Sequence, residues 1–398
     1  MGRYMLDNRN KQLSIYCRWL GIYMLFVILG AMSFGTLGSL LKIIGFIPVA
    51  IWLIQKHRFY TNRIIFFSIL FVIWSSISFF WSINTSSSFS RAITQLSFLL
   101  MLMSVAGYYY RADEVIYLKK CMIWSSRLTA VIVMFTGTYA QSRLLLSGII
   151  SENPNYLCAY FLFALANATV NILSTQSELY QKIIAIIEIA VYIYITFATG
   201  SRGGLLSLVI ASVFIVLFYK DSQEIKGISI IKKIGIILLA AGIYGVVISY
   251  MPSEIARRFT EDALINSNNG SGRYLLWEDS INAFRKSGIT RKLIGYGAET
   301  SRNISYLFDF RIHNVIHNIF IEYLVEIGIV GLSLYVLHIL CFVISSIRSK
   351  DIFCLSILFG MIVLSVSSSI YAFKPYWNIM ILTLCMVRKS NQIDNEGH

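Results

Sequence analysis

The sequence has few charged residues and few prolines, and these shortages exclude an ordinary soluble domain. Only 14% of its 398 residues are charged and only four are proline, whereas 57% are hydrophobic. The mean hydropathy is +0.67. Apolar runs of about 17 residues or more recur along the chain, which is long enough for a membrane span. The alternating segments of a transmembrane barrel are absent. Composition therefore predicts one integral α-helical membrane domain over residues 1–398.

Cysteine and basic residues also occur in patterns that exclude two classes of protein. The six cysteines all lie within or beside apolar runs, so we expect small core residues and no disulfides. The net charge of +14 is scattered over short loops and forms no continuous stripe. Nucleic acid is therefore not an expected partner. Membrane topology and contacts with anionic lipid or diphosphate explain the basic excess better.

Apolar stretches suited to cross a hydrocarbon core of about 30 Å can be read directly from the sequence. They are residues 19–36, 37–54, 64–82, 92–109, 121–139, 155–173, 182–199, 204–219, 233–250, 328–346, 352–369 and 375–387. The longest polar segment between them is 251–315. We therefore expect an all-α fold of about twelve transmembrane helices with one large extracytoplasmic loop.

Basic residues are distributed unequally between alternate loops. If the N-terminus is inside, the short outer loops hold few basic residues: Arg91, Arg143, Arg202 and Lys374. The loop 251–315 is basic as well, but a loop of that length is exempt from the positive-inside rule. Both termini are therefore expected in the cytoplasm, and 251–315 outside it.

Arg202 lies at the expected start of a span, in the motif TGSRGG at 199–204. An arginine at a helix end is also typical of side chains that reach lipid headgroups. Here Gly203 and its glycine neighbours would let backbone N–H groups approach an anion where the helix dipole favours negative charge. The motif predicts a phosphate-binding corner, with a headgroup anchor as the alternative.

Arg273 follows the glycine-containing turn SNNGSG at 267–272 in the long polar loop. The next apolar side chains have helical spacing, at Tyr274, Trp277, Ile281 and Phe284. We therefore expect an amphipathic helix over 273–284 above the membrane mouth, followed by a GYG turn at 295–297. Most charges of the loop are expected to be solvated. Arg273 stands out because it would occupy the helix start.

His313 and His317 are four residues apart and are expected to share a helical face. Their HNVIH motif has Asn where zinc-binding HExxH has Glu, so we expect no metal. The Asp-x-Asp metal motif of many nucleotide-sugar glycosyltransferases is also absent. His317 then has two candidate roles, a general base or a structural helix cap. An ordinary imidazole base predicts activity that falls as the pH drops through about 6.5.

Lys42 and Glu188 lie inside expected spans, where charged residues often mark a translocation path. No half-length repeat accompanies them, although repeats are typical of transporters. Arg202, Arg273 and His317, in contrast, are expected at one membrane face beside one long loop. An enzyme is therefore favoured over a transporter or a flippase of lipid-linked glycans.

Three motifs occur together between residues 183 and 345. They are the arginine of T-x-SRGGLL, the arginine of GR-x-x-x-W followed by GYG, and HN followed ten residues later by Gly328. Together they resemble the O-antigen ligase and O-antigen polymerase superfamily of bacterial envelope glycosyltransferases, whose shared core would cover 183–345. Each motif alone is weak, and the combination is fairly specific.

The resemblance implies a GT-C-like membrane glycosyltransferase of the bacterial inner (plasma) membrane that needs no metal or other cofactor. Its donor would be an undecaprenyl-diphosphate-linked oligosaccharide, and a flippase and a chain-length regulator are candidate partners besides the lipid bilayer. The implied catalytic residues are His317, which would act on the acceptor hydroxyl, and Arg202 and Arg273, which would hold the diphosphate. The substrate-binding residues would be Arg202, Arg273, Gly203, Trp277, Tyr296 and Asn318. Two guanidiniums can stabilise a departing diphosphate without Mg²⁺.

Two reactions are known within the superfamily. Polymerases join lipid-linked glycans into longer chains, whereas ligases move the finished chain onto lipid A core, which completes lipopolysaccharide. The motif SGR-x-x-x-W resembles polymerases of O-antigen, capsule or exopolysaccharide somewhat more closely than it resembles ligases. Polymerisation is therefore the preferred expectation and ligation the alternative, because fold alone does not fix an acceptor.

The charge asymmetry gives a direct test of topology. A reporter that is active only outside the cytoplasm should work when fused near Asn268 and fail when fused after Lys226, because the positive-inside rule places these positions on opposite faces. The opposite pattern would invert the topology and remove the candidate residues from an extracytoplasmic donor.

Overall fold

The computed structural model describes residues 13–27, 35–55, 60–140, 143–145, 154–220, 226–250, 253–256, 273–369 and 374–396. Regular structure in these ranges is almost wholly helical, as predicted. The sequence did not predict the short antiparallel hairpin of β1 (Thr138–Ala140) and β2 (Arg143–Leu145), which follows Gly137 at the end of a long helix.

Every predicted span overlaps a helix. These helices are α1 (Ile15–Leu25), α2 (Gly35–Ile54), α3 (Arg63–Ile77) with the 3-10 turn η2 (Ser78–Trp81), α4 (Thr85–Ala106), α5 (Ala112–Thr136), α6 (Pro154–Leu173), α7 (Leu179–Ala198), α8 (Arg202–Phe218), α9 (Lys226–Ser249), α16 (Gly328–Arg348), α17 (Ile352–Ser365) and α18 (Lys374–Glu396). The predicted starts of α4 and α5 are several residues late. Polar caps explain the difference, because Asn84 accepts a hydrogen bond from Ser87 N and Glu114 accepts one from Arg111 N.

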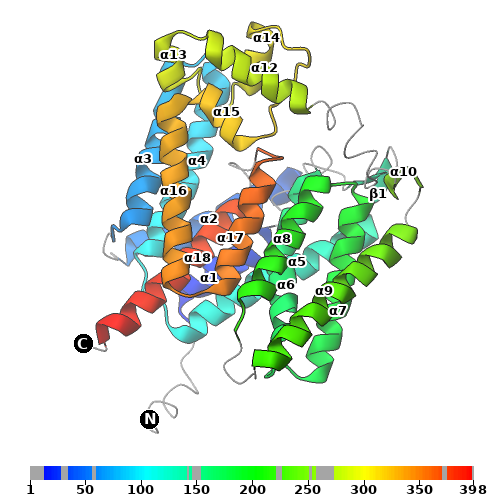
Figure 1. Cartoon of the computed structure of the whole chain (residues 1–398). Coiled ribbons are helices and arrows are strands. Elements are labelled where there is room, and N and C mark those ends of the chain that lie inside the picture. Colours follow the sequence, from blue (N-terminus) through cyan, green and yellow to red (C-terminus); the bar gives the residue numbers. More distant parts are fainter. Residues whose placement is uncertain are drawn as a thin grey trace.

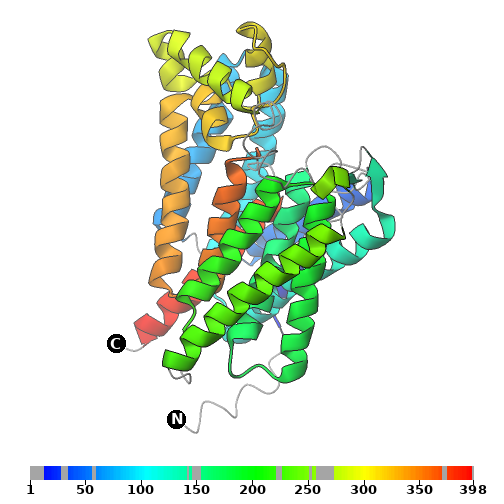
Figure 2. The ribbon, with the colours of Figure 1, turned by 45° about the vertical axis from the view of Figure 1, so that its right-hand side comes forward.

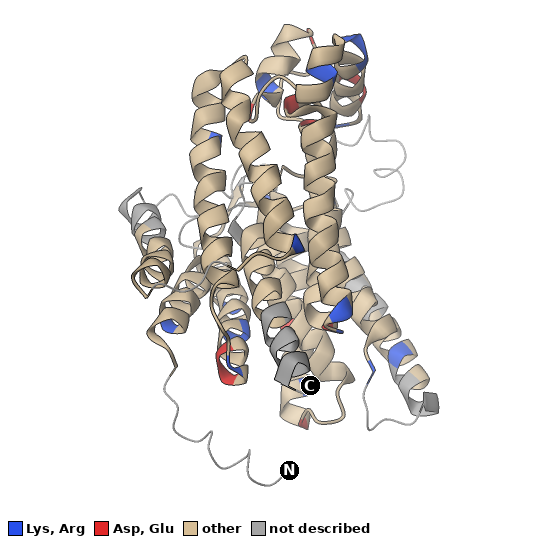
Figure 3. Cartoon of the chain, turned by 90° about the vertical axis from the view of Figure 1, so that its left-hand side faces the viewer, with Lys and Arg blue, Asp and Glu red and all other residues tan. Residues whose placement is uncertain are grey.

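Five helices in the described ranges are long and apolar enough to cross a membrane. They cover Arg63–Trp81, Thr85–Ala106, Pro154–Leu173, Leu179–Ala198 and Gly328–Arg348. Charged residues gather toward the two ends of the molecule, and the helical segments between contain few of them (Figure 3). This distribution suits a protein that spans a bilayer. The count of twelve spans stays a prediction.

The long helices form two adjoining groups (Figures 1 and 2). In one group α3 packs against α4 and α16, and in the other α6 packs against α5, α7 and α8. Helix α17 joins them, because it packs against both α8 and α16. Inside the first group Ser68 Oγ and His338 Nδ1 lie 2.9 Å apart, a buried polar contact between α3 and α16.

Residues 273–326 fold into a small cap over one end of α3, α4 and α16 (Figure 1). The cap consists of α12 (Arg273–Lys286), α13 (Ile289–Ile294), α14 (Ser301–Leu307) and α15 (Ile319–Glu326), and the four-residue α10 (Ser253–Ala256) precedes it in the chain. Its helices enclose an apolar cluster of their own, made of Leu276, Ala283, Tyr296, Ile304, Phe310, Ile316 and Val325. A loop was predicted for most of this region, because such short helices leave little periodic signal.

The helix predicted over 273–284 is present as α12, but its buried face differs from the prediction, and its position above a membrane mouth stays a prediction. Helix α12 buries Leu276, Ser280 and Ala283, whereas Tyr274 is 60% exposed. Serine and alanine on a packed face allow close approach, and an apolar-only pattern overlooks them. The predicted SNNGSG turn at 267–272 lies outside the described residues.

The GYG turn holds the cap to the long helices. Both glycines have positive φ, 74° at Gly295 and 108° at Gly297, and Gly328 at the start of α16 has φ 73°. A Cβ on Gly295 would lie 2.2 Å from Glu326 O, and a Cβ on Gly328 would lie 2.2 Å from Leu293 O. Gly295 and Gly328 therefore lie at the same place, where the backbone of the turn crosses the backbone of the α15–α16 junction.

Candidate active site

Arg202 is the first residue of α8, as predicted. The chain enters the helix through Gly200, whose φ is 65°, and Ser201 Oγ accepts a hydrogen bond of 3.0 Å from Gly204 N. These contacts form an N-terminal cap. The Arg202 side chain is partly exposed beside it.

The glycines after Arg202 are explained by packing. A Cβ on Gly203 would lie 2.2 Å from Ser367 Oγ, and a Cβ on Gly204 would lie 2.3 Å from Cys158 Sγ. The end of α17 and the start of α6 therefore press directly on this turn of α8. A role for Gly203 in binding substrate stays a prediction.

His317 lies in the irregular segment between α14 and α15, with φ 56°. The predicted shared helical face with His313 is therefore wrong, because residues 311–318 are not helical. His313 turns to other partners: its ring stacks on Tyr306 at 4.3 Å, and its Nδ1 lies 3.1 Å from Ser305 O. A left-handed conformation is uncommon outside glycine, and histidine tolerates it better than most residues.

The structure brings Arg273 into the electrostatic environment of His317. Burial, then the positive charges of Arg273 and Arg302, lower the pKa of His317 to about 4. Its Nδ1 is buried and accepts or donates no hydrogen bond within the described part of the chain. The imidazole is therefore neutral at physiological pH. The prediction that activity falls as the pH drops through about 6.5 assumed an ordinary imidazole pKa, and it does not fit this environment.

Two neighbours position the His317 backbone. Trp277 Nε1 of α12 donates a hydrogen bond of 3.0 Å to Ile316 O. Asn318 Oδ1 accepts hydrogen bonds from Phe320 N at 3.0 Å and Ile321 N at 3.3 Å, and so caps α15. Both polar groups are engaged in fixing the fold. The structure therefore shows a positioning role for Trp277 and Asn318, while their predicted contact with substrate stays untested.

Tyr296 of the GYG turn lies inside the cap. Its hydroxyl is 2.8 Å from Ser287 Oγ, and the Arg291 guanidinium lies 5.0 Å from the centre of its ring. The side chain is 9% exposed. These contacts describe a residue that packs the cap, and binding of substrate by Tyr296 stays a prediction.

A buried chain of polar contacts connects the α8 corner to α17. Asn155 at the start of α6 accepts a hydrogen bond from Ser201 Oγ. Its Nδ2 donates to Ser367 O at 3.0 Å and to Ser368 Oγ at 2.7 Å. The neighbouring Tyr156 hydroxyl donates to Ser369 O at 2.8 Å. Residues 367–369 are therefore anchored directly beside Arg202.

The same chain continues into the cap through two buried glutamates of α15. Ser369 Oγ donates to Glu322, which also accepts a hydrogen bond of 3.2 Å from Ser301 Oγ. Glu326 accepts hydrogen bonds from Ser301 N at 2.8 Å and Glu299 N at 2.9 Å. Burial, then the charge of Glu322, raises the pKa of Glu326 well above its usual range. The start of α8 and the helix after His317 thus belong to one connected end of the molecule.

Sequence reasoning did not identify this network. Asn318, Glu322 and Glu326 recur every four residues and share a face of the helix. That spacing of polar residues just before an apolar span was a usable signal. The contacts of Asn155 with residues more than 200 positions away had no such signal.

The charged residues inside the predicted spans have a structural explanation. Glu188 of α7 and Arg127 of α5 form an ion pair at 2.5 Å, and the Arg127 guanidinium also lies 4.7 Å from the centre of the Trp124 ring. Glu188 is therefore paired, which weakens the transport interpretation. The side chain of Lys42 lies outside the described residues.

The six cysteines are free, as predicted, and five of them are buried. In the described ranges no group of three or more His, Cys, Asp or Glu side chains could hold a metal ion. His313 and His317 in particular do not converge on one point through a shared helix.

The structure thus has apolar helices long enough to cross a membrane and a helical cap in which Arg273 and Arg302 act on a neutral His317. Residues 187–336 match the family described as O-antigen ligase. This match supports the O-antigen ligase and polymerase superfamily that the motifs predicted. The match and the five apolar helices indicate a membrane protein, and the family suggests an enzyme of glycosyl transfer. No curated protein matches the chain.

The environment of His317 predicts the effect of a substitution. Arg273→Ala should raise the pKa of His317 from about 4 toward the ordinary imidazole value of about 6.5, because a positive charge that opposes protonation is removed. Histidine-selective NMR of the purified protein in nanodiscs measures the midpoint. Arg285→Ala, at the exposed end of the same helix, is the matched control and should change nothing. An unchanged titration midpoint of His317 in Arg273→Ala would show that the charge of Arg273 does not act on His317.

Proposed function

We propose that the protein transfers a glycan from undecaprenyl diphosphate to an acceptor hydroxyl at the outer face of the inner membrane, and that its reaction is polymerisation of polysaccharide repeat units. The observation that carries the proposal is the shared environment of Arg273 and His317 in a cap that is tied to the α8 corner of Arg202. The family match to O-antigen ligase supports the reaction class.

The donor would bind through its diphosphate. Arg202 and Arg273 are each the first residue of a helix, where the backbone N–H groups and the positive end of the helix dipole also favour an anion. When the anomeric carbon–oxygen bond breaks, both electrons leave with the diphosphate. Two forked guanidiniums stabilise that charge.

His317 would accept the proton of the attacking hydroxyl. The acceptor oxygen forms the new bond to the anomeric carbon while the neutral imidazole takes the proton. In the free protein, burial and the two arginines make this imidazole a weak base. The negative charge of a bound diphosphate offsets Arg273 and Arg302, so donor binding raises the pKa of His317. The base is thus strengthened when the donor is present.

The preference for polymerisation comes from the sequence SGR-x-x-x-W around Arg273. A ligase that moves finished chains onto lipid A core is the second candidate, and the description of the matched family favours it. Both reactions use the same donor and the same base, and they differ in the acceptor.

Substitution of the three residues tests the shared chemistry. Arg202→Ala and Arg273→Ala should each lower transfer at least about a hundredfold, because a donor to the leaving charge is lost. Lysine at either position should restore only part of the rate, since it lacks the planar fork. The measurement is transfer of the lipid-linked glycan by purified variants in detergent or nanodiscs. Near-normal rates in an alanine variant would leave that arginine as a headgroup anchor.

His317→Ala should lower turnover by about 10²–10⁴-fold and keep donor affinity, which the arginines supply. His317→Asn is the matched variant for folding, because asparagine also tolerates a positive φ. His313→Ala, whose ring stacks on Tyr306, should retain activity. Full activity in both His317 variants would end the proposal of a histidine base.

A deletion strain separates polymerase from ligase. Loss of a polymerase should leave single repeat units on their final acceptor, because export and attachment continue without elongation. Loss of a ligase should leave long chains stranded on undecaprenyl diphosphate. Electrophoresis of the envelope glycans and mass spectrometry of the lipid-linked pool distinguish these outcomes. Stranded long chains would establish the ligase and overturn polymerisation.

A further inference from the structure

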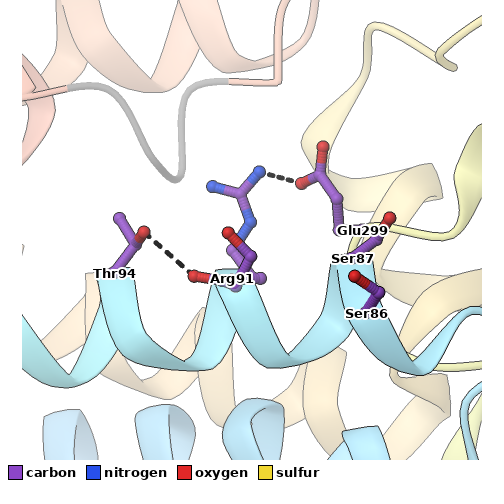
Figure 4. A pocket seen from close by; sticks show the side chains of 6 residues that line it. Ser86, Ser87, Arg91, Thr94 and Glu299 are labelled. Atoms are coloured by element: carbon purple, nitrogen blue, oxygen red, sulfur yellow. Dashed lines mark hydrogen bonds and ion pairs between the residues drawn. The ribbon is translucent and has the colours of Figure 1, made fainter.

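A second polar site lies beside the cap, on the N-terminal half of α4. It is a hollow of about 340 Å³ lined by Ser86, Ser87, Ser90, Arg91, Thr94 and Glu299. Small-ligand sites typically have volumes of about 300–1,000 Å³. Figure 4 shows the Arg91 guanidinium reaching across the hollow to the Glu299 carboxylate, with the hydroxyls along the helix below.

One face of α4 has different neighbours along its length. Toward its C-terminal end, α18 covers this face, and Phe98 stacks on Trp377 with ring centres 5.1 Å apart. Toward its N-terminal end, the face carries the serines and Thr94 that line the hollow. Hydroxyls on an apolar helix that is long enough to span a membrane need polar partners. Thr94 Oγ1 meets this need through its own helix, at 3.1 Å from Ser90 O.

The walls of the hollow are held in place before any ligand arrives. Asn84 Nδ2 donates to Asn303 Oδ1 at 3.2 Å, and Ser88 Oγ donates to Ala298 O at 2.5 Å. These bonds join the start of α4 to the segment that carries Glu299. Glu299 itself has φ 62°, an uncommon conformation, and Glu326 fixes it by accepting its backbone N–H.

The charges of the hollow favour a neutral, hydroxyl-rich ligand. Arg91 and Glu299 form an ion pair whose side chains are 13% and 39% exposed. The carboxylate cancels much of the arginine charge, so a free phosphate would gain little there. A sugar offers hydroxyls that donate to the carboxylate and accept from the guanidinium and serines.

We propose that this hollow binds a sugar residue of the acceptor glycan, an inference that rests on the proposed function. The segment 298–303 connects it to the reaction, because Glu299 lines the hollow while Arg302 acts on His317. Glu322 of α15 connects this segment to the corner of Arg202, because it accepts hydrogen bonds from both Ser301 and Ser369. The hollow and the surroundings of His317 therefore share the segment 298–303.

Direct binding tests the inference independently of turnover. The probe is the repeat-unit oligosaccharide released from the lipid carrier of the producing strain, titrated into the full-length protein in nanodiscs and followed by calorimetry or saturation-transfer NMR. Ser90→Trp fills the hollow, and Glu299→Gln removes its carboxylate. Each should weaken binding at least about tenfold, equivalent to about 1.4 kcal/mol. Ile93→Trp is the matched control, since Ile93 lies on α4 outside the hollow and is 53% exposed.

The outcomes separate the inference from the proposed function. Loss of binding in Ser90→Trp and Glu299→Gln, with wild-type affinity in Ile93→Trp, supports the inference. Absence of oligosaccharide binding by the wild type, wild-type affinity in Ser90→Trp, or displacement of the sugar by inorganic phosphate would overturn it. Donor transfer by the wild type is measured beside it, and its absence would overturn the proposed function whether or not the hollow binds sugar.

Discussion

The crossing of two backbones at glycine is the constraint on which the rest of this structure depends. Gly295 lies against Glu326, and Gly328 lies against Leu293, each so close that a Cβ would meet a carbonyl oxygen at 2.2 Å. Tyr296 N and Gly297 N complete the junction by donating to Val325 O and Glu326 O. The crossing fixes the turn against α15. Helix α12 is joined to the segment before α15 by the hydrogen bond from Trp277 Nε1 to Ile316 O, next to His317.

The buried glutamates extend that constraint to the second group of helices. A buried carboxylate is costly unless hydrogen bonds satisfy it. Glu326 is satisfied by two backbone N–H groups, and Glu322 by two serine hydroxyls from different segments. Either residue replaced by an apolar one would leave these donors unpaired. The network therefore couples the cap to α17 and α6 through polar contacts that only one arrangement of the chain completes.

The end of the molecule that carries the cap has two different electrostatic environments. Around His317, burial and then the positive charges of Arg273 and Arg302 keep the imidazole neutral, and the two positive charges suit an anionic leaving group. In the hollow on α4, Arg91 and Glu299 neutralise each other among hydroxyls, which suits an uncharged sugar. The proposed transfer of a diphosphate-linked glycan to a hydroxyl needs both environments, one for the charged leaving group and one for the uncharged acceptor.

The sequence by itself determined the class of the protein, the helical fold and the starts of α8 and α12, because apolar runs, glycine turns and helix-start signals are local. The motif set also identified the superfamily. Only the tertiary structure decided that His317 lies in an irregular segment with a depressed pKa, that Gly203 faces Ser367, and that Glu322 and Glu326 are buried. These properties depend on which distant segments remove water from a side chain and which charges they bring, and no local pattern specifies such neighbours.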